Sequence, residues 1–257
     1  MRPAPVVLVV LSLLASGCEL VGGGLIDSIV TEQPSPGLPR LDGTFADSFD
    51  EKDGRWPVTT GTAGQTESGS ASEASEDSAE IAYREGGYQV TLPAGRHLVP
   101  TAPVTYTSDV SVTVGAKALR LDQPGRRLGG VWGLACDADD EQSYYFAGVQ
   151  TTLGVGYAGI GKVEESRIRS IVPFGQPHRT IDADGVNDLQ MQCSGAAGER
   201  TITFTINGEV VAEGTDRNAA DEPRPVAAGL VVDTSSLPRG RPFIVRFDEF
   251  SLSEEGG

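Results

Sequence analysis

Few side chains in this 257-residue sequence could carry out catalysis. The two histidines, His97 and His178, lie far apart in the sequence, and the Gly-x-Ser-x-Gly motif of serine hydrolases is absent. The densest acidic run, DADDE at 137–141, lacks the glycine and the terminal glutamate of a calcium-binding loop. We therefore predict a solvated turn at DADDE and a surface position for His97 after the turn at 93–96. We predict no catalytic residue, no metal and no cofactor.

The residues around Cys18 indicate that its thiol is a site of covalent modification rather than of catalysis. It follows a largely apolar run at 6–15, too short to span a bilayer, and two small residues, Ser16 and Gly17. The segment resembles the lipobox of bacterial lipoproteins. The resemblance implies removal of a signal peptide, residues 1–17, and a diacylglycerol on the sulfur of Cys18. The protein would then be anchored to the cell membrane at its extracytoplasmic face. The alternatives are an ordinary secretory signal with a chance cysteine, or a buried N-terminal strand.

The other two cysteines, Cys136 and Cys193, form an even pair outside the reducing cytosol. In such a compartment a disulfide bond between them is the expected state. Two buried thiols in neighbouring strands remain the alternative.

The charge of the chain excludes one class of partner. The formal net charge is −16, with 36 acidic and 20 basic residues. Binding to a phosphate backbone needs clustered Lys and Arg, so we predict that the protein does not bind nucleic acid.

Apolar residues alternate with polar ones along most of the chain, which is typical of strands with one buried face. The pattern is clear at 110–114 and at 202–206, and the second run ends in Asn207-Gly208, a strong hairpin signal. Cys136 and Cys193 each share the parity of large apolar neighbours. In the last strand, a bulge near residues 248–249 would return the following apolar residues to the buried side.

These patterns predict an all-β fold, a two-sheet antiparallel sandwich forming a single domain at 44–257. A Gly- and Pro-rich stretch at 18–43 is expected to be a flexible tether without regular structure. A second low-complexity stretch at 59–80, acidic and without a basic residue, is expected to be a solvated insertion.

Strand-like motifs follow one another in the order FADSFDEKDGRW, AYREGGYQVTL, SDVSVTV, GGVWGLACDADDEQSYYFAGV, GYAGIGKV, NDLQMQCSG, RTITFTINGEVVAE, AAGLVV and VRFDEFSLS. This series resembles concanavalin A-like, laminin G-like jelly rolls, and is most similar to the bacterial domains of the 3-keto-disaccharide hydrolase family. The resemblance implies a jelly roll whose concave face, in many relatives, contacts carbohydrate or another protein. It does not imply catalysis, because the Glu-x-Asp-x-x-Glu strand of glucanases on this scaffold is absent.

Sugar-binding sites place aromatic faces and hydrogen-bonding groups on a concave surface. Trp132, Tyr144 and Tyr157 lie on the central strands of the matching pattern, and we predict them as ligand-binding residues. Tyr144 and Phe146 lie on the opposite side of their strand from Tyr145, so one of these two sets must face away from the core. The alternative is that these aromatic residues fill the core.

We therefore expect a lipid-anchored, extracytoplasmic, non-catalytic module that binds a cell-envelope glycan or an envelope protein. A divergent glycoside hydrolase acting on a disaccharide or polysaccharide is one alternative. A structural partner of a membrane complex is another, and the sequence leaves open whether the protein is an enzyme.

Overall fold

The computed structural model describes the backbone of residues 29–31 and then residues 38–50, 56–57, 60–61, 79–118, 129–139, 143–152, 154–165, 167–195, 198–219, 224–237 and 242–254. Cys18 and most of the 59–80 insertion lie outside the described residues. Within them, no helix has the length and apolarity that a membrane crossing requires.

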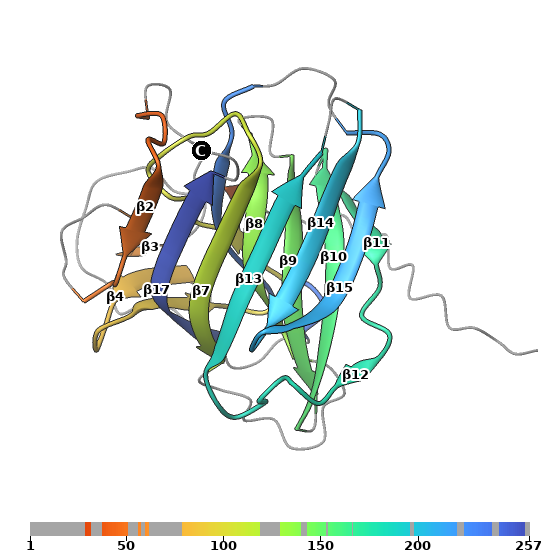
Figure 1. The fold of residues 1–257 in the computed structure, drawn as a ribbon. Helices are drawn as coiled ribbons and strands as arrows, with labels where there is room; N and C mark the ends of the chain where they lie inside the picture. Colours follow the sequence, from red (N-terminus) through yellow and green to blue (C-terminus); the bar gives the residue numbers. More distant parts are fainter. Residues whose placement is uncertain are drawn as a thin grey trace, which may run out of the picture.

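The strands form two sheets packed face to face (Figure 1). Sheet I has the order β1 (Ile29–Thr31), β6 (His97–Val99), β16 (Ala227–Asp233), β8 (Val131–Ala138), β9 (Tyr144–Thr152), β10 (Val155–Glu164) and β11 (Arg167–Val172), with β12 (Pro177–His178) also paired to β10. Sheet II has the order β15 (Glu209–Asp216), β14 (Arg200–Ile206), β13 (Asn187–Ser194), β7 (Val110–Ala118), β17 (Phe243–Glu254), β5 (Tyr88–Leu92), β4 (Ala79–Tyr83) and β3 (Thr60–Gly61), with β2 (Thr44–Asp47) paired to β17. The predicted all-β, two-sheet sandwich is confirmed.

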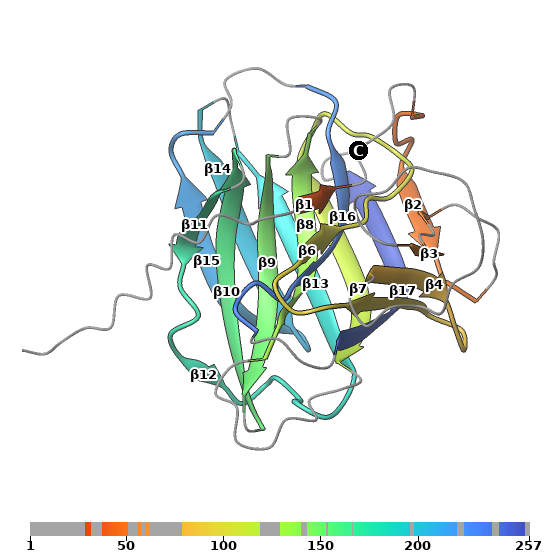
Figure 2. The same ribbon diagram turned by 180° about the vertical axis from the view of Figure 1, so that it is seen from behind.

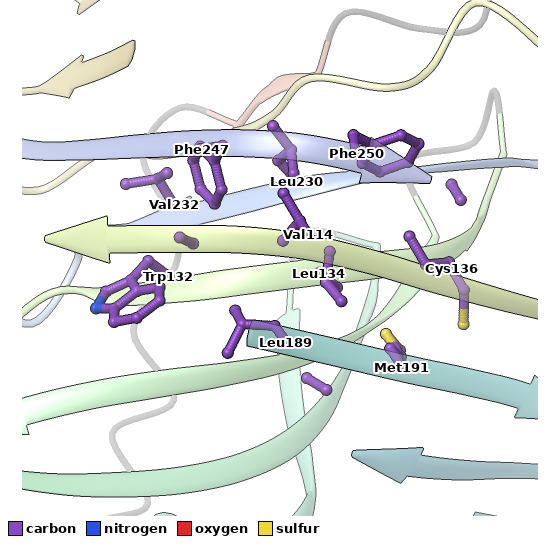
Figure 3. Packing of buried hydrophobic residues seen from close by; sticks show 14 of the residues in the cluster. Val114, Trp132, Leu134, Cys136, Leu189, Met191, Leu230, Val232, Phe247 and Phe250 are labelled. Atoms are coloured by element: carbon purple, nitrogen blue, oxygen red, sulfur yellow. The ribbon is translucent and has the colours of Figure 1, made fainter. Parts of the chain in front are cut away.

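The main core lies between the sheets and is built by alternation along each strand. From β8, Trp132, Leu134 and Cys136 enter it, and β13 contributes Leu189 and Met191 (Figure 3). Buried apolar area of this kind is the main stabilising contribution in a sandwich.

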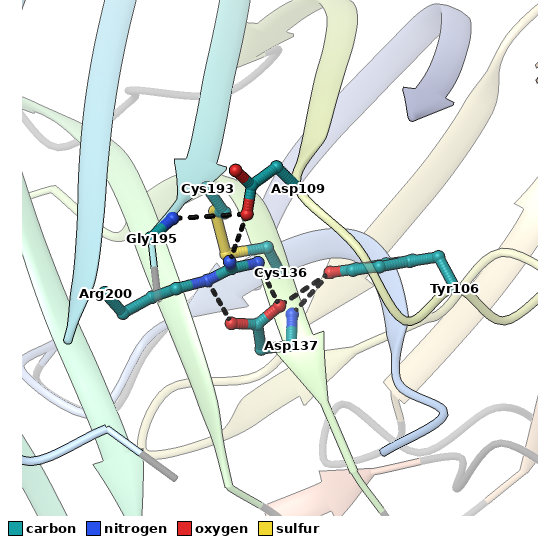
Figure 4. The surroundings of a disulfide bond; sticks show 7 residues. All are labelled: Tyr106, Asp109, Cys136, Asp137, Cys193, Gly195 and Arg200. Carbon is teal, nitrogen blue, oxygen red and sulfur yellow. Dashed lines mark hydrogen bonds and ion pairs between the residues drawn. A yellow bond between two sulfur atoms is a disulfide. The ribbon is translucent and has the colours of Figure 1, made fainter. Parts of the chain in front are cut away.

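A disulfide bond joins Cys136 of β8 to Cys193 of β13, so the predicted pairing is confirmed. The bond connects sheet I to sheet II. Beside it, the Arg200 guanidinium binds both carboxylate oxygens of Asp137, at 2.7 and 2.9 Å (Figure 4). The same guanidinium donates to Asp109 at 2.9 Å, and the amide of Asp137 donates to the Tyr106 hydroxyl at 2.7 Å. Charge-assisted, bidentate contacts of this kind are among the stronger hydrogen bonds in proteins.

Two turn predictions are also confirmed. Asn207 and Gly208 connect β14 to β15 with φ of 51° and 81°, which suits a tight hairpin turn of type I′. In β17 the register with β7 shifts between Asp248 and Ser251, and Glu249 has a φ of 54°. This bulge brings Phe250 back to the core.

Within the expected flexible tether at 18–43, the structure shows ordered contacts at two places. Residues Ile29–Thr31, three β-branched residues in a row, form β1 and pair in parallel with β6. Leu41 is buried in the main core, and its amide donates to the Thr105 carbonyl at 2.7 Å. The expected insertion begins and ends in strands, because Thr60 pairs with Glu80 across β3 and β4.

Candidate functional site

The face of sheet I that points away from the core carries a second apolar cluster, which we call the outer-face cluster. Figure 2 looks onto this side of the sheet. Its buried members are Val99, Val131, Ala135, Ala138, Tyr144, Phe146, Val163 and Val231, and Phe174 packs against them. The outward-facing residues of a sandwich are usually polar and solvated, so an apolar cluster here marks this face as the candidate site.

Three glycines lie side by side across the middle of this face. Gly133 of β8 pairs with Gly148 of β9, and Gly148 pairs with Gly159 of β10. Glycine weakens a strand by about 0.5–1 kcal/mol relative to alanine, and in a strand it often marks the close approach of another group. The row has no side chains of its own, and neighbouring groups fill the space above it: a Cβ atom built on Gly148 would stand 2.5 Å from Cγ1 of Val131.

An aromatic ring occupies part of that space. Phe174 follows β11, and a Cβ atom built on Gly159 would stand 2.6, 2.7 and 2.8 Å from three carbons of its ring. Because these distances are nearly equal, the ring lies face-on over Gly159. Phe146 approaches Gly161 with the edge of its ring, because only two ring carbons, both at 2.6 Å, lie closer to the position of a Cβ than the Arg169 carbonyl oxygen at 3.2 Å. Phe146 is buried, whereas Phe174 keeps part of its surface in solvent.

Next to the glycine row lie two partly exposed residues, Tyr157 of β10 and Gln150 of β9. They are directly opposite each other, and Pro177 of β12 pairs with Tyr157 on its other side. Gln150 donates from its side-chain amide to the Gly129 carbonyl at 3.1 Å, which fixes its position. The site thus combines two accessible aromatic rings with a fixed amide group.

A buried polar chain lies on the same face. His97 is 0% exposed, and its Nε2 forms a hydrogen bond with the Tyr144 hydroxyl. Its Nδ1 lies 3.7 Å from a carboxylate oxygen of Asp233. Burial raises the pKa of Tyr144 well above its usual value, and the charge of Asp233 raises it further. Burial also acts to raise the pKa of Asp233, but the nearby His97 and the hydrogen bond that the Ser235 amide donates at 2.7 Å outweigh it, so this pKa is lowered.

A carboxylate, an imidazole and a phenol in line resemble the relay of a hydrolase. Here the phenol of Tyr144 is 1% exposed and stays protonated, so in this arrangement it cannot reach a ligand. The chain Asp233–His97–Tyr144 therefore stabilises the face rather than performing acid–base chemistry on it. The predicted surface position of His97 is wrong, because its side chain points into the covered outer face.

A further charged cluster lies where β10 and β11 of sheet I meet β15 of sheet II. Asp216 accepts a hydrogen bond from the Tyr145 hydroxyl at 2.9 Å and pairs with Arg169 at 2.7 Å and Lys162 at 3.6 Å. Lys162 also pairs with Glu164 at 2.9 Å. All these groups satisfy one another, and we assign the cluster a structural role.

The predicted ligand-binding residues are separated by the structure. Trp132 fills the main core and is 1% exposed, so its ring presents no face to a ligand. Tyr144 is equally buried, in the outer-face cluster, and only Tyr157 retains exposed surface. The prediction that Tyr144 and Phe146 face away from Tyr145 is confirmed, because Tyr145 belongs to the main core.

The prediction of a solvated turn at DADDE is wrong for Asp139, while Asp140 and Glu141 lie outside the described residues. The Asp139 carboxylate is 2% exposed, accepts from the Ser143 amide at 2.8 Å and pairs with Arg224. Among the residues that the structure describes, no group of three or more histidine, cysteine or acidic side chains is placed to hold a metal ion.

Sequence reasoning missed Phe174, Gln150 and the glycine row. The signal that could have found the row is a glycine in the middle of each of three strand-like segments, at Gly133, Gly148 and Gly159.

No protein-family model matches this chain, and no curated protein matches it. Its fold is similar to that of a CBM2 module of the evolved Dit protein of Lactobacillus casei BL23 phage J-1, with a TM-score of 0.51 and 8% identity, covering 82% of this chain and 95% of that one. It is also similar to a structure from a study of endo-acting O-glycanases that members of the human gut microbiota use to initiate mucin breakdown, with a TM-score of 0.53 and 11% identity, covering 82% and 99%. A galectin-like protein of unknown function from Bacillus subtilis aligns with a TM-score of 0.48 and 13% identity, covering 82% and 94%. At these identities the likeness concerns the fold alone, which is an all-β, two-sheet antiparallel sandwich.

Proposed function

We propose that this protein is a lipid-anchored, extracytoplasmic domain that binds a cell-envelope glycan on the outer face of sheet I without cleaving it. The observation that carries the proposal is the Phe174 ring, held face-on over Gly159 with part of its surface in solvent. A ring fixed in this way is a rigid platform on which the apolar face of a sugar can stack at little cost in side-chain entropy.

The neighbours of Phe174 suit the same ligand. Tyr157 adds a second aromatic surface with a hydroxyl group, and Gln150 adds an amide that can hydrogen-bond to sugar hydroxyls. A few polar groups around aromatic surfaces are typical of sites that fix the orientation of a small ligand.

Two proteins of similar fold add support. One is named a CBM2 module, and the other comes from work on O-glycanases that initiate mucin breakdown; both align with TM-scores above 0.5. Since a jelly roll hosts both binding and catalytic proteins, the fold alone does not decide between these roles.

The buried state of the acid–base groups favours binding over hydrolysis. Asp233, His97 and Tyr144 contact one another beneath the surface of the face. Asp139, the acidic residue nearest to a catalytic role in the sequence, is buried and paired with Arg224. A glycosidase needs two carboxyl groups about 5–9 Å apart that both reach the scissile bond.

The anchoring part of the proposal relies on the residues around Cys18, which lie outside the described residues. The disulfide between Cys136 and Cys193 supports an oxidising compartment, where such bonds form and persist.

A glycan array tests the proposal. The mature chain with Cys18→Ser, which prevents acylation, is screened on the array, and every glycan that binds is then analysed for cleavage products. We expect saturable binding without products. The variants Phe174→Ala and Tyr157→Ala should each weaken binding by about tenfold, the equivalent of 1.4 kcal/mol.

The matched control is Phe45→Ala, which removes a partly exposed aromatic ring from sheet II and should leave binding unchanged. Binding that survives the loss of both Phe174 and Tyr157 would place the site elsewhere. Released sugar would show that the protein is an enzyme, and the absence of any bound glycan would contradict the proposal.

A further inference from the structure

The accessible surface of the proposed site continues beyond Phe174 along β11. Ser170 pairs with Gly161 of β10, and Ile168 pairs with Val163. Directly paired residues share one face of a sheet, and Val163 belongs to the outer-face cluster. Ile168 and Ser170 therefore lie on the same face as Phe174.

The side chains on this face follow a regular spacing along β10. Tyr157 stands at the first level, and Phe174 covers Gly159, two residues further on. Ser170 stands beside Gly161, which is two residues beyond Gly159, and Ile168 stands beside Val163, which is two residues beyond Gly161. This stripe consists of Tyr157, Phe174, Ser170 and Ile168. At about 3.3 Å per residue, the stripe from residue 157 to residue 163 of β10 is about 20 Å long.

The stripe ends in an apolar side chain that the fold does not require. Ile168 is 40% exposed and belongs to neither buried cluster. Among the strands that the structure describes, β11 is the edge of sheet I, so nothing in those strands covers it on that side. Ser170 is exposed as well, and Tyr157 and Phe174 are partly exposed, so every member of the stripe keeps surface in solvent that a ligand can contact.

We propose that the ligand is a linear glycan chain that lies lengthwise along β10 and β11, with its first rings on Tyr157 and Phe174 and a later ring on Ile168. This inference rests on the proposed glycan binding and specifies its ligand as an extended chain rather than a single terminal sugar. The hydroxyl of Ser170 lies between the two apolar ends and provides a hydrogen-bonding group for the middle of the chain.

A length series tests the inference. The probes are β-1,4-linked N-acetylglucosamine oligomers, α-1,4-linked glucose oligomers and oligomers of whichever glycan binds most strongly on the array, each from one to six units. Affinities are measured by calorimetry with the Cys18→Ser chain. We expect the affinity for at least one series to rise at least tenfold from the disaccharide to the longest oligomer.

Substitutions separate the two ends of the stripe. Ile168→Ser should weaken the longest oligomer by about threefold to tenfold, the effect of losing one apolar contact, and leave the disaccharide unchanged. Phe174→Ala should weaken every length that binds. Val210→Ser is the matched control, because Val210 is 58% exposed on the edge strand of sheet II, and it should change no affinity.

The outcomes distinguish this inference from the proposed function. If an oligomer binds with an affinity independent of its length, or if Ile168→Ser leaves the longest oligomer unaffected, the lengthwise arrangement is wrong while glycan binding stands. If no glycan binds on the array or in any series, both are wrong.

Discussion

The ring of Tyr144 stacks on the ring of His97, with centroids 5.7 Å apart and planes 24° from parallel. Their strands are not neighbours. His97 pairs with Asp233, Asp233 with Val131 and Val131 with Gln150, and Gln150 lies six positions beyond Tyr144 in β9. In a flat sheet the two residues would be separated by about 14 Å across the strands and about 20 Å along them. Sheet I must therefore be strongly twisted or bent, which brings these two diagonally opposite positions together over its outer face.

The hydrogen bond between Tyr144 and His97 should contribute to stability. Tyr144→Phe keeps the stacked ring but leaves Nε2 of a fully buried imidazole without its partner. We expect the free energy of unfolding to fall by about 1–3 kcal/mol, measured by urea denaturation. Tyr157→Phe, which removes a hydroxyl from a partly exposed ring, is the control and should change stability by less than about 0.5 kcal/mol. Equal losses in both variants would contradict the assigned role.

The position of Phe174 depends on the absence of a side chain at Gly159. In Gly159→Ala the new methyl group would overlap the ring, which must then move from its platform. We expect a loss of about 1–3 kcal/mol in the free energy of unfolding, together with weaker glycan binding. In the control Gly175→Ala, on the same segment, the nearest atom would be 3.9 Å from the new carbon. A Gly159→Ala protein that binds glycan normally would exclude Phe174 as the platform.

The disulfide should account for a large part of the stability of the domain. Cys136 and Cys193 are 57 positions apart, and closing a loop of that length restricts the unfolded chain by about 4 kcal/mol. Addition of a reductant should lower the guanidinium chloride midpoint accordingly. A double variant, Cys136→Ala with Cys193→Ala, should start from the lower midpoint and show no response to the reductant. An unchanged midpoint in the reduced wild-type protein would show that the bond adds little.

The carboxylate of Asp216 should make stability depend on pH in the acid range. Burial acts to raise its pKa, but hydrogen bonds from Arg169, from the Asn218 amide and from Tyr145 outweigh it, so the pKa is lowered on folding. A lowered pKa stabilises the folded state above the unfolded value of about 3.9, and this contribution disappears as the pH falls through the folded value.

The difference in unfolding free energy between the wild type and Asp216→Asn should therefore be full at pH 6 and shrink steadily below about pH 4. The exposed residue Asp188 gives the control Asp188→Asn. A difference that stays constant from pH 6 to pH 2 would show that the pKa of Asp216 does not change on folding.

The proposed anchor predicts a change in localisation. Cys18→Ala removes the thiol that would carry the diacylglycerol, so the protein should move from the membrane pellet to the soluble fraction when the cells are fractionated. Acyl chains on the wild-type chain should be visible as added mass on its N-terminal peptide. A variant that still sediments with membranes would require another attachment.

The sequence predicted features that depend on a few adjacent residues. The turn at Asn207 and Gly208 was predictable because their conformational preferences are local, and so was the side of the strand that Cys136 faces. Burial that depends on contacts with distant parts of the chain was not predictable in this way. Asp139 was expected in solvent, yet Arg224, far along the chain, covers it in the fold.

The candidate site shows the same limit more sharply. Tyr157 could be proposed as a ligand-binding residue from its type and position. Phe174 could not, because its role depends on its contact with Gly159, which only the folded structure shows. The row of Gly133, Gly148 and Gly159 exists because three strands align in one register, and register between strands is a property of the whole fold.

The contact between Leu41 and Thr105 has a mechanical consequence. The amide of Leu41 donates to the Thr105 carbonyl, and the amide of Thr105 donates to the Pro39 carbonyl, so the N-terminal segment enters the domain beside Tyr106. The hydroxyl of Tyr106 accepts from the amide of Asp137, the residue after Cys136. If the domain is pulled between an N-terminal anchor and a glycan held on sheet I, the pairing of β1 with β6 in sheet I is loaded first, and the contacts of Leu41 are loaded only after that pairing opens.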